Sequence, residues 1–197
     1  MRNGKVSTHP ARLVRLRKEN NVRVRFLDEQ EEKTVRTKIR ELYPDCEPEF
    51  DLALHTGMRR GEQYRLRWQD VDLKRSMIAI PHSKHGEARH AQINSVAGAA
   101  LLKLRQRGDG VGYVCAGLEG PRNRDWRRWF EEVVKEAKIA NSRWHDLRHT
   151  FASRLAMAGV DLRSVQELMG HKTISMRVRY SHLAPTHVQK VVERLTE

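Results

Sequence analysis

Cysteine, long apolar runs and nucleotide-binding motifs are scarce or missing in this sequence. The two cysteines, Cys46 and Cys115, lie far apart and neither belongs to a C-x-x-C pair, which argues against a disulfide framework or a thiolate zinc site. No apolar stretch approaches the roughly 18 residues of a membrane span, and the first residues lack the apolar segment of a signal peptide. We therefore expect a cytoplasmic protein with no membrane partner.

Two phosphate-binding motifs are also missing. The sequence has neither G-x-x-x-x-G-K-[ST] nor G-x-G-x-x-G, so ATP-driven and nicotinamide-dependent enzymes have no support. It also shows no carboxylate cluster of the kind that holds magnesium. The sequence thus predicts no cofactor and no metal.

Acidic residues are few relative to basic ones. The chain of 197 residues carries 25 Asp and Glu against 38 Lys and Arg, which gives a formal net charge of +13. Most of the basic residues are arginine, 27 in all, the side chain that binds a phosphate with two parallel hydrogen bonds. The length suits one domain with at most an appended arm, and the charge makes a polyanion the leading candidate partner.

The chain divides into an arm, a domain and a short tail. Residues 1–25 contain eight basic residues and one acid, and we expect them to form a basic arm or linker. Apolar residues at helical spacing then run from Phe26 to residue 184, with Gly and Pro at the breaks; a third helix is predicted at Met58–Leu66. The predicted strands are Met77–Ile80, His82–Lys84 and Arg89–Ile93. This pattern predicts an α+β domain, mainly α, with one small antiparallel sheet.

Two clusters of polar side chains lie on predicted helices. His145, Arg148 and His149 share one helix face at i, i+3 and i+4, and an imidazole beside a guanidinium suits a phosphate oxyanion. Arg59 follows a predicted glycine cap and precedes Glu62 by one helical turn, so that the carboxylate can hold the guanidinium ready for a phosphate. Taken alone, a solvated helix face and an ordinary surface ion pair explain these clusters better.

Two further candidates lie beside glycines. Lys84 stands at a strand end next to the Gly86 turn, where an ammonium can protonate a leaving oxygen, although a hairpin lysine is more often an edge-strand charge. His171 follows the capping Gly170, and Tyr180 comes nine residues later among arginines, whose charge favours the phenolate. A tyrosine is more often a packed ring with its hydroxyl on a backbone carbonyl.

The order and spacing of these clusters point to one family. An arginine in T-G-x-R-x-x-E, a lysine in a hairpin, H-x-L-R-H on a helix, a later L-x-G-H and a tyrosine nine residues on together resemble the catalytic domain of tyrosine recombinases, the phage integrase family. The resemblance covers Phe26 to Leu183, and its most characteristic run is HDLRHTFAS, residues 145–153. The segment Asn20–Arg25 is similar to the linker that precedes this domain.

The resemblance implies how the phosphate is held and attacked. Arg59 and Arg148 match the two arginines that hold the non-bridging oxygens of the scissile phosphate, and Glu62 matches the acidic residue that supports the first arginine. Tyr180 matches the nucleophile. The basic residues that we expect to contact DNA are Arg15, Arg17, Arg60 and Lys172.

The resemblance also implies where protons move. Lys84 matches the hairpin lysine that acts as general acid on the leaving 5′ oxygen. His145 matches the histidine that handles the tyrosine proton, and His171 matches a second histidine, which is hydrogen-bonded to the phosphate.

Together these roles imply site-specific recombination or integration of double-stranded DNA. Attack by the tyrosine gives a 3′-phosphotyrosine that conserves the bond energy for rejoining, so no ATP is needed. Two guanidiniums and an imidazole would take the place of a metal ion. Two alternatives stay open: a type IB topoisomerase, which relaxes DNA without partner exchange, and a non-catalytic helix-turn-helix module in residues 161–180.

The resemblance finally implies an assembly. Members of the family carry an N-terminal core-binding domain that closes around DNA, for which residues 1–25 are too short, so we expect a catalytic domain preceded by the remnant of a linker. The tail at residues 185–197 carries a narrow apolar stripe and is similar to a C-terminal segment that docks onto the next protomer. We expect a homo-tetramer on DNA and a monomer in solution.

Overall fold

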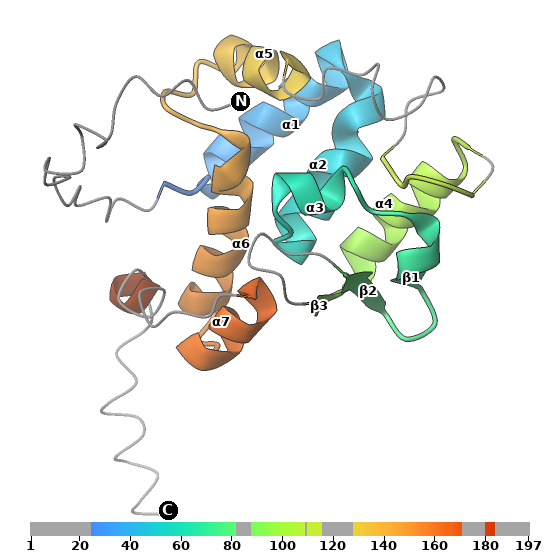
Figure 1. Ribbon diagram of the computed structural model, residues 1–197. Helices are drawn as coiled ribbons and strands as arrows, with labels where there is room; N and C mark the ends of the chain where they lie inside the picture. The colour runs from blue at the N-terminus through green and yellow to red at the C-terminus, as the bar shows by residue number, and fades with distance from the viewer. Residues whose placement is uncertain (1–24, 82–87, 109, 116–127, 171–179, 184–197) are drawn as a thin grey trace, which may run out of the picture.

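The computed structural model describes residues 25–81, 88–108, 110–115, 128–170 and 180–183 (Figure 1). The helices in these ranges are α1 (Glu29–Leu42), α2 (Glu47–Thr56), α3 (Arg60–Gln63), α4 (Ser95–Arg105), α5 (Arg128–Glu136), α6 (Trp144–Met157) and α7 (Leu162–Met169). The strands are β1 (Val71–Asp72), β2 (Met77–Ile80) and β3 (Arg89–Gln92), and the 3-10 helices are η2 (Pro44–Cys46), η3 (Trp68–Asp70) and η4 (Ser181–Leu183). The fold is α+β, mainly α, with one small antiparallel sheet, which confirms the prediction.

The first two helices begin and end at residues that favour helix termini. Asp28 caps α1 in a capping box, because its side chain accepts the Glu31 N–H while the Glu31 carboxylate accepts the Asp28 N–H. Helix α2 ends at Gly57, whose φ of 60° is left-handed. A Cβ at Gly57 would overlap Cδ1 of Phe151, so the end of α2 packs directly on α6.

The sheet has the order β1-β2-β3 and is antiparallel throughout. Ile78 pairs with Ala91, and Ile80 pairs with Arg89. Ile78, Ile80 and Ala91 are buried, and they pack with Leu52 of α2 and with residues of α4. Because side chains alternate along a strand, Arg89 shares the inward face of β3 with Ala91.

Local predictions around the sheet were incomplete. The two-residue strand β1 lies outside the predicted strands, since two residues are too short to show an alternating pattern. The helix predicted over Met58–Leu66 is only the four-residue α3. It begins late because Arg59 has extended backbone and caps it. It ends early because the N–H groups of Arg65 and Leu66 donate to carbonyls three residues back, at 3.3 and 3.2 Å, instead of four.

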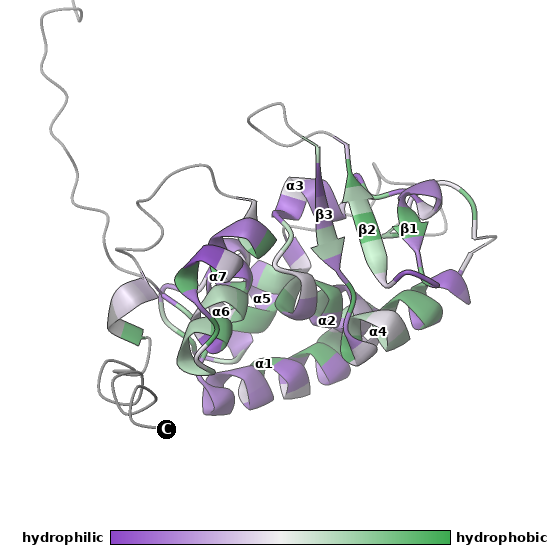
Figure 2. Cartoon of the chain, turned by 90° about the horizontal axis from the view of Figure 1, so that it is seen from below, coloured by the Kyte–Doolittle hydropathy of each residue, from purple (hydrophilic) through white to green (hydrophobic). Residues whose placement is uncertain are grey.

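Helix α6 connects the parts of the core. It contacts α2, α7 and η4, and Figure 1 shows it beside α1 and α2 with α7 near its C-terminal end. Its N-terminal half, with Trp144 and Leu147, packs in an aromatic cluster with residues of α1, α2 and α5, whereas Ala152 and Ala156 pack with α7 and Tyr180. Figure 2 shows that the outer side of α1 is hydrophilic. None of the described helices is long and apolar enough to cross a membrane.

Candidate active site

Arg59 and Glu62 form an ion pair at the turn between α2 and α3. The Arg59 N–H donates to Oε2 of Glu62 at 2.8 Å, and Nη1 of Arg59 donates to Oε1 of Glu62 at 2.8 Å. The two side chains are 18% and 5% exposed. The carboxylate therefore fixes both the backbone and the guanidinium of Arg59, which is the pairing that the T-G-x-R-x-x-E spacing predicts.

A second guanidinium, from β3, binds the same carboxylate. Arg89 donates from Nη2 to Oε2 of Glu62 at 2.6 Å and from Nη1 to the carbonyl of Leu168 at 3.1 Å. Burial alone would raise the pKa of Glu62, but the charges and hydrogen bonds of Arg89 and Arg59 outweigh it and lower that pKa. Glu62 is therefore ionised at neutral pH and holds two arginines from different parts of the chain.

Arg148 is the most deeply buried arginine in the described part of the chain. It lies on α6, is 2% exposed, and donates from Nη1 to the carbonyl of Gly57 and from Nη2 to the carbonyl of Met169. These carbonyls stand at the C-terminal ends of α2 and α7, where the backbone partial charge is negative and favours a cation. Burial, reinforced by the charges of Arg59 and Arg89, lowers the pKa of Arg148 to about 9.

Arg59, Arg89 and Arg148, with Glu62, form what we call the arginine cluster. Three guanidiniums and one carboxylate leave an excess of positive charge in a largely buried place. Buried Nε atoms of Arg89 and Arg148 find no hydrogen-bond acceptor within the described structure, although buried donors ordinarily have one. An oxyanion at the cluster would supply both the missing acceptors and the missing negative charge.

Tyr180 lies close enough to this cluster for its charge to act on Arg148. Its ring is 1% exposed and packs among Ala152, Ala156, Val165 and Met169. Its hydroxyl oxygen lies 2.5 Å from Nδ1 of a histidine on α6, His149. The charge state of Tyr180 acts on Arg148, as do the charges of the other members of the arginine cluster, so the phenol and the guanidiniums belong to one site.

The two histidines of the predicted helix face differ in depth. His145 is exposed, whereas His149 is half-buried, and their rings meet edge to face with centroids 4.9 Å apart. Sequence reasoning placed both on this face but gave the role beside the tyrosine to His145. The structure places His149 against the Tyr180 hydroxyl.

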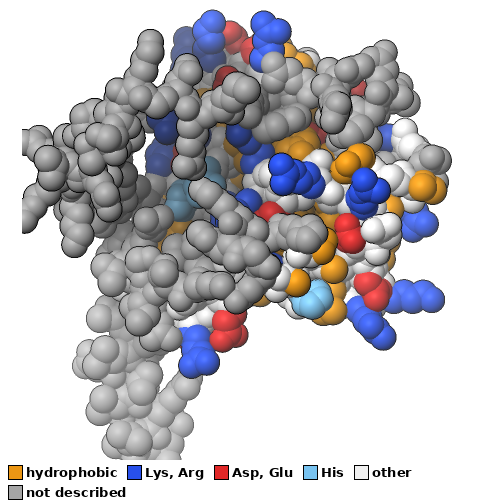
Figure 3. All heavy atoms as spheres, in the orientation of Figure 1, with side chains coloured by type: hydrophobic (Ala, Val, Ile, Leu, Met, Phe, Trp, Pro, Cys, Tyr) orange, Lys and Arg blue, Asp and Glu red, His pale blue; other side chains and the backbone are white. Residues whose placement is uncertain are grey.

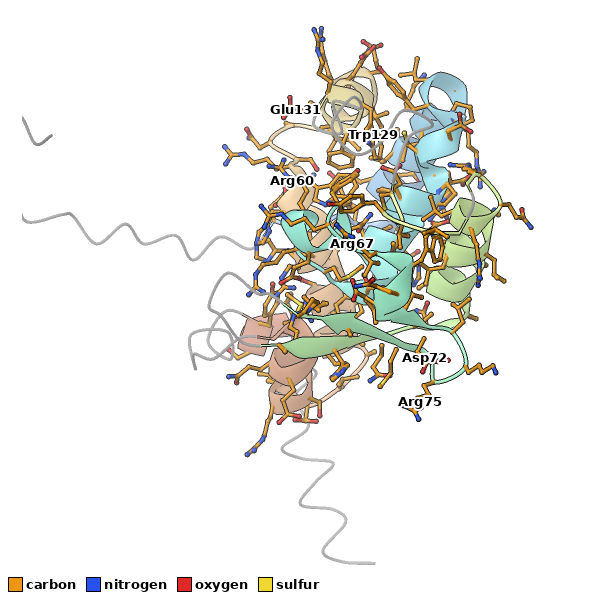
Figure 4. The ribbon with its side chains drawn as sticks, turned by 45° about the vertical axis from the view of Figure 1, so that its right-hand side comes forward. Arg60, Arg67, Asp72, Arg75, Trp129 and Glu131 are labelled. Carbon is orange, nitrogen blue, oxygen red and sulfur yellow. The ribbon has the colours of Figure 1, made fainter. Side chains whose placement is uncertain are left out.

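Most of the other predicted site residues lie outside the described ranges. Lys84, His171, Lys172, Arg15 and Arg17 lie outside the described residues, so their roles stay predictions. Arg60 comes from α3 and lies apart from Asp72 and Arg75, which stand at the turn between β1 and β2 (Figure 4).

Arg89 is the one member of the cluster that the sequence analysis did not single out. The signal that could have found it is its position in β3, where it alternates with Ala91 and so faces inward. An arginine on the inward face of a strand needs buried partners.

The donors of the site are nitrogen cations and a phenol. Among the described residues, no three His, Cys, Asp or Glu side chains are grouped so that they could hold a metal ion. Reaction without a metal stays a prediction.

Residues 17–187 match the Phage integrase family. The chain belongs to the phage integrase family. It is 32% identical over 194 residues to the integrase of Salmonella phage P22, an alignment that covers 90% of this chain and 49% of that protein. The chain thus spans about half the length of the first curated relatives that it matches.

Solved structures of integrases share the fold. The catalytic domain of bacteriophage HP1 integrase superposes with a TM-score of 0.69 at 26% identity, over 87% of this chain and 95% of that chain. The Tn1549 transposon integrase in complex with transposon right end DNA superposes with a TM-score of 0.75 at 21% identity, over 91% of this chain and 68% of that chain.

Proposed function

We propose that the chain catalyses site-specific recombination or integration of DNA by cleaving and rejoining strands through a 3′-phosphotyrosine, without a metal ion. The observation that carries this proposal is the arginine cluster, in which the buried Nε atoms of Arg89 and Arg148 lack acceptors among the described residues and the charge of Tyr180 acts on Arg148. Fixed positive charge of this kind stabilises the charge that gathers on the phosphate oxygens in the transition state.

The roles that we propose rest on the family's motifs, and the ion pair between Arg59 and Glu62 supports them. Arg59 and Arg148 hold the non-bridging oxygens, and Glu62 keeps Arg59 in place. The Oη of Tyr180 attacks phosphorus, the bond from phosphorus to the 5′ oxygen breaks, and Lys84 protonates that oxygen as it leaves. His171 donates a hydrogen bond to the phosphate. The reverse steps rejoin the strand, because the phosphotyrosine bond retains the energy of the phosphodiester.

The proposed partner is double-stranded DNA. The net charge of +13 supports it, as do the lysine and arginine side chains across the face seen in Figure 3 and the DNA in the complex of the Tn1549 integrase. We propose that Arg15, Arg17, Arg60 and Lys172 contact the phosphate backbone.

The proposed assembly is a homo-tetramer on DNA. In this assembly the tail at residues 185–197 docks on a neighbouring protomer, and residues 1–25 serve as a basic linker.

Covalent trapping tests the proposal. The probe is a library of nicked DNA duplexes of random sequence, in which cleavage near the nick releases a short strand and leaves the protein attached. We expect an adduct on a denaturing gel that persists in EDTA and disappears in Tyr180→Phe, while DNA binding is retained. The matched control is Tyr43→Phe, whose hydroxyl bonds to Glu132 on the α1–α5 side of the molecule, and which should still form the adduct.

Other outcomes would redirect the assignment. An undiminished adduct in Tyr180→Phe would exclude Tyr180 as the nucleophile, and cleavage that requires magnesium would contradict the mechanism. Relaxation of a supercoiled plasmid without strand exchange would indicate a topoisomerase activity instead. DNA binding without any adduct would indicate a DNA-binding module.

A further inference from the structure

We propose that His149, rather than His145, accepts the proton of Tyr180 when the phenol attacks the phosphate. This inference rests on the proposed function, since it assigns the base for the same nucleophile. A phenol is a weak nucleophile until it loses its proton, so a base within hydrogen-bond reach is a chemical requirement of the step.

His149 is in hydrogen-bond contact with the hydroxyl of Tyr180. Nδ1 of His149 lies 2.5 Å from the Tyr180 hydroxyl oxygen, within the range in which a general base takes a proton directly. If the hydroxyl donates, Nδ1 is the acceptor and Nε2 carries the ring hydrogen, which is the neutral tautomer that can take a second proton. His145 is exposed one helical turn earlier and contacts His149 with its ring.

Tyr180 is buried among apolar side chains. The Tyr180 ring is 1% exposed and its neighbours Ala152, Ala156, Val165 and Met169 are apolar. Bulk water therefore has little access to the ring side of the phenol, and the proton needs a protein acceptor. His149 lies on α6 and is half-buried, so its ring contacts the buried hydroxyl on one side and is partly exposed on the other.

The surroundings of His149 and Tyr180 carry an excess of positive charge. The described ionisable groups of this site are His145 and Arg148 on α6, Arg59 and Glu62 at α3, and Arg89 on β3. Protonated His149 would add a further positive charge to this excess. A bound phosphodiester offsets that charge, so the base becomes effective when the substrate is in place and not before.

In the proposed step the Oη–H bond of Tyr180 breaks, and its proton moves to Nδ1 of His149. At the same time Oη forms a bond to phosphorus, and the bond from phosphorus to the 5′ oxygen breaks. The leaving oxygen takes its proton from the general acid. On rejoining, His149 returns the proton to Tyr180 as the 5′ oxygen attacks the phosphotyrosine.

The test separates proton transfer from hydrogen bonding. His149→Asn places an amide oxygen near the position of Nδ1, so it can accept the hydrogen bond but cannot take the proton. With duplexes selected by the trapping experiment, we expect adduct formation to slow by about 10²- to 10⁴-fold, with DNA affinity unchanged. Replacement of Tyr180 by difluorotyrosine, whose phenol ionises more readily, should restore a large part of the rate in His149→Asn.

The matched variant is His145→Asn, which removes the neighbouring imidazole from the same helix face. It should be slowed less than His149→Asn, and difluorotyrosine should not restore its rate. His149→Gln is the second variant, with thermal unfolding measured for each protein, so that a folding defect in one variant leaves the other to decide.

Each remaining outcome decides the matter. An unslowed or faster His149→Asn would overturn the proposal, and so would a slow variant that difluorotyrosine does not restore. A rate restored in His145→Asn instead would assign the proton to His145. Absence of any adduct with the unmodified chain would overturn the proposed function itself, and the role of His149 with it.

Discussion

Gly170 lies against the side chain of Arg89 with no room for a Cβ between them. A Cβ built on Gly170 would overlap Cδ of Arg89 and lie 2.8 Å from its Nε. The glycine also has a φ of 60°, which disfavours any other residue. The C-terminal cap of α7 is thus a packing surface for a member of the arginine cluster.

Gly170→Ala should damage the cluster as well as the helix cap. We expect the thermal midpoint to fall further than in Gly112→Ala, the matched control, which has a φ of 81° but no atom within 4 Å of an added Cβ. The backbone cost common to both is about 1–2 kcal/mol. We expect sulfate to bind the native cluster, and it should therefore raise the midpoint of Gly112→Ala more than that of Gly170→Ala. Equal sulfate shifts would show that Arg89 does not contribute to anion binding.

Glu62→Gln should change how stability depends on pH. The lowered pKa of Glu62 means that the folded state favours the carboxylate. The ionised side chain therefore stabilises the folded protein fully at pH values above its unfolded pKa of about 4.3. This stabilisation is lost as the pH falls through the lower pKa of the folded state. We expect Glu62→Gln to be less stable at neutral pH by up to about 3 kcal/mol. The two proteins should converge in acid, as measured by urea unfolding from pH 7 downward.

The control for this measurement is Glu167→Gln. Glu167 pairs with Arg163 at 3.2 Å, but both side chains are largely exposed, so its loss should cost less than about 1 kcal/mol. If Glu62→Gln behaved like Glu167→Gln, the cluster would be no more than a surface ion pair.

Arg148→Lys should retain the charge but lose the geometry. A lysine ammonium cannot span the carbonyls of Gly57 and Met169 with a planar fork. We expect adduct formation to slow by about 10²- to 10³-fold with DNA affinity nearly unchanged, measured by trapping and by fluorescence anisotropy. Arg163→Lys, on the exposed side of α7, serves as the control. A binding defect that matched the rate defect would assign Arg148 to ground-state binding.

Neutralising the basic arm should weaken DNA binding without slowing the reaction, the reverse of the effect expected for Arg148→Lys. We expect Arg15→Gln together with Arg17→Gln to weaken binding to all DNA sequences and to flatten the salt dependence of the affinity by about one unit per lost phosphate contact. The rate of adduct formation at saturating DNA should not change. A slower reaction with unaltered affinity would mean that the arm acts on chemistry.

The sequence could predict those parts of the site that are local. Arg59 and Glu62 are three residues apart beside a glycine cap, so their pairing follows from helix geometry. How deeply each side chain of a helix face is buried does not follow from the spacing of residues in the sequence. His145 and His149 are equivalent at i and i+4, and the packing of α7 and Tyr180 against α6 decides which of them is half-buried.

Arg89 shows why the rest of the site could not be predicted. Its partners are 27 and 79 residues away in the chain, so no short motif contains them. Its position depends on the register of β2 and β3 and on how α7 packs beside the sheet. Similarly, α3 is shorter than the apolar spacing suggests, because Arg59 stands in extended backbone before it and the N–H groups of Arg65 and Leu66 donate to carbonyls three residues back.

The two carbonyls that Arg148 binds belong to residues 91 positions before it and 21 positions after it. One guanidinium therefore joins the ends of α2 and α7, and the chain that leaves α7 leads to Tyr180. Partial unfolding of α7 would free the Arg148 guanidinium from the Met169 carbonyl. The same event would displace Tyr180, which packs on residues of α7. Arg148 thus contributes both to the proposed chemistry and to the cooperative folding of α2 and α7. When an anion binds, amide hydrogen exchange in the last turns of these two helices should slow together.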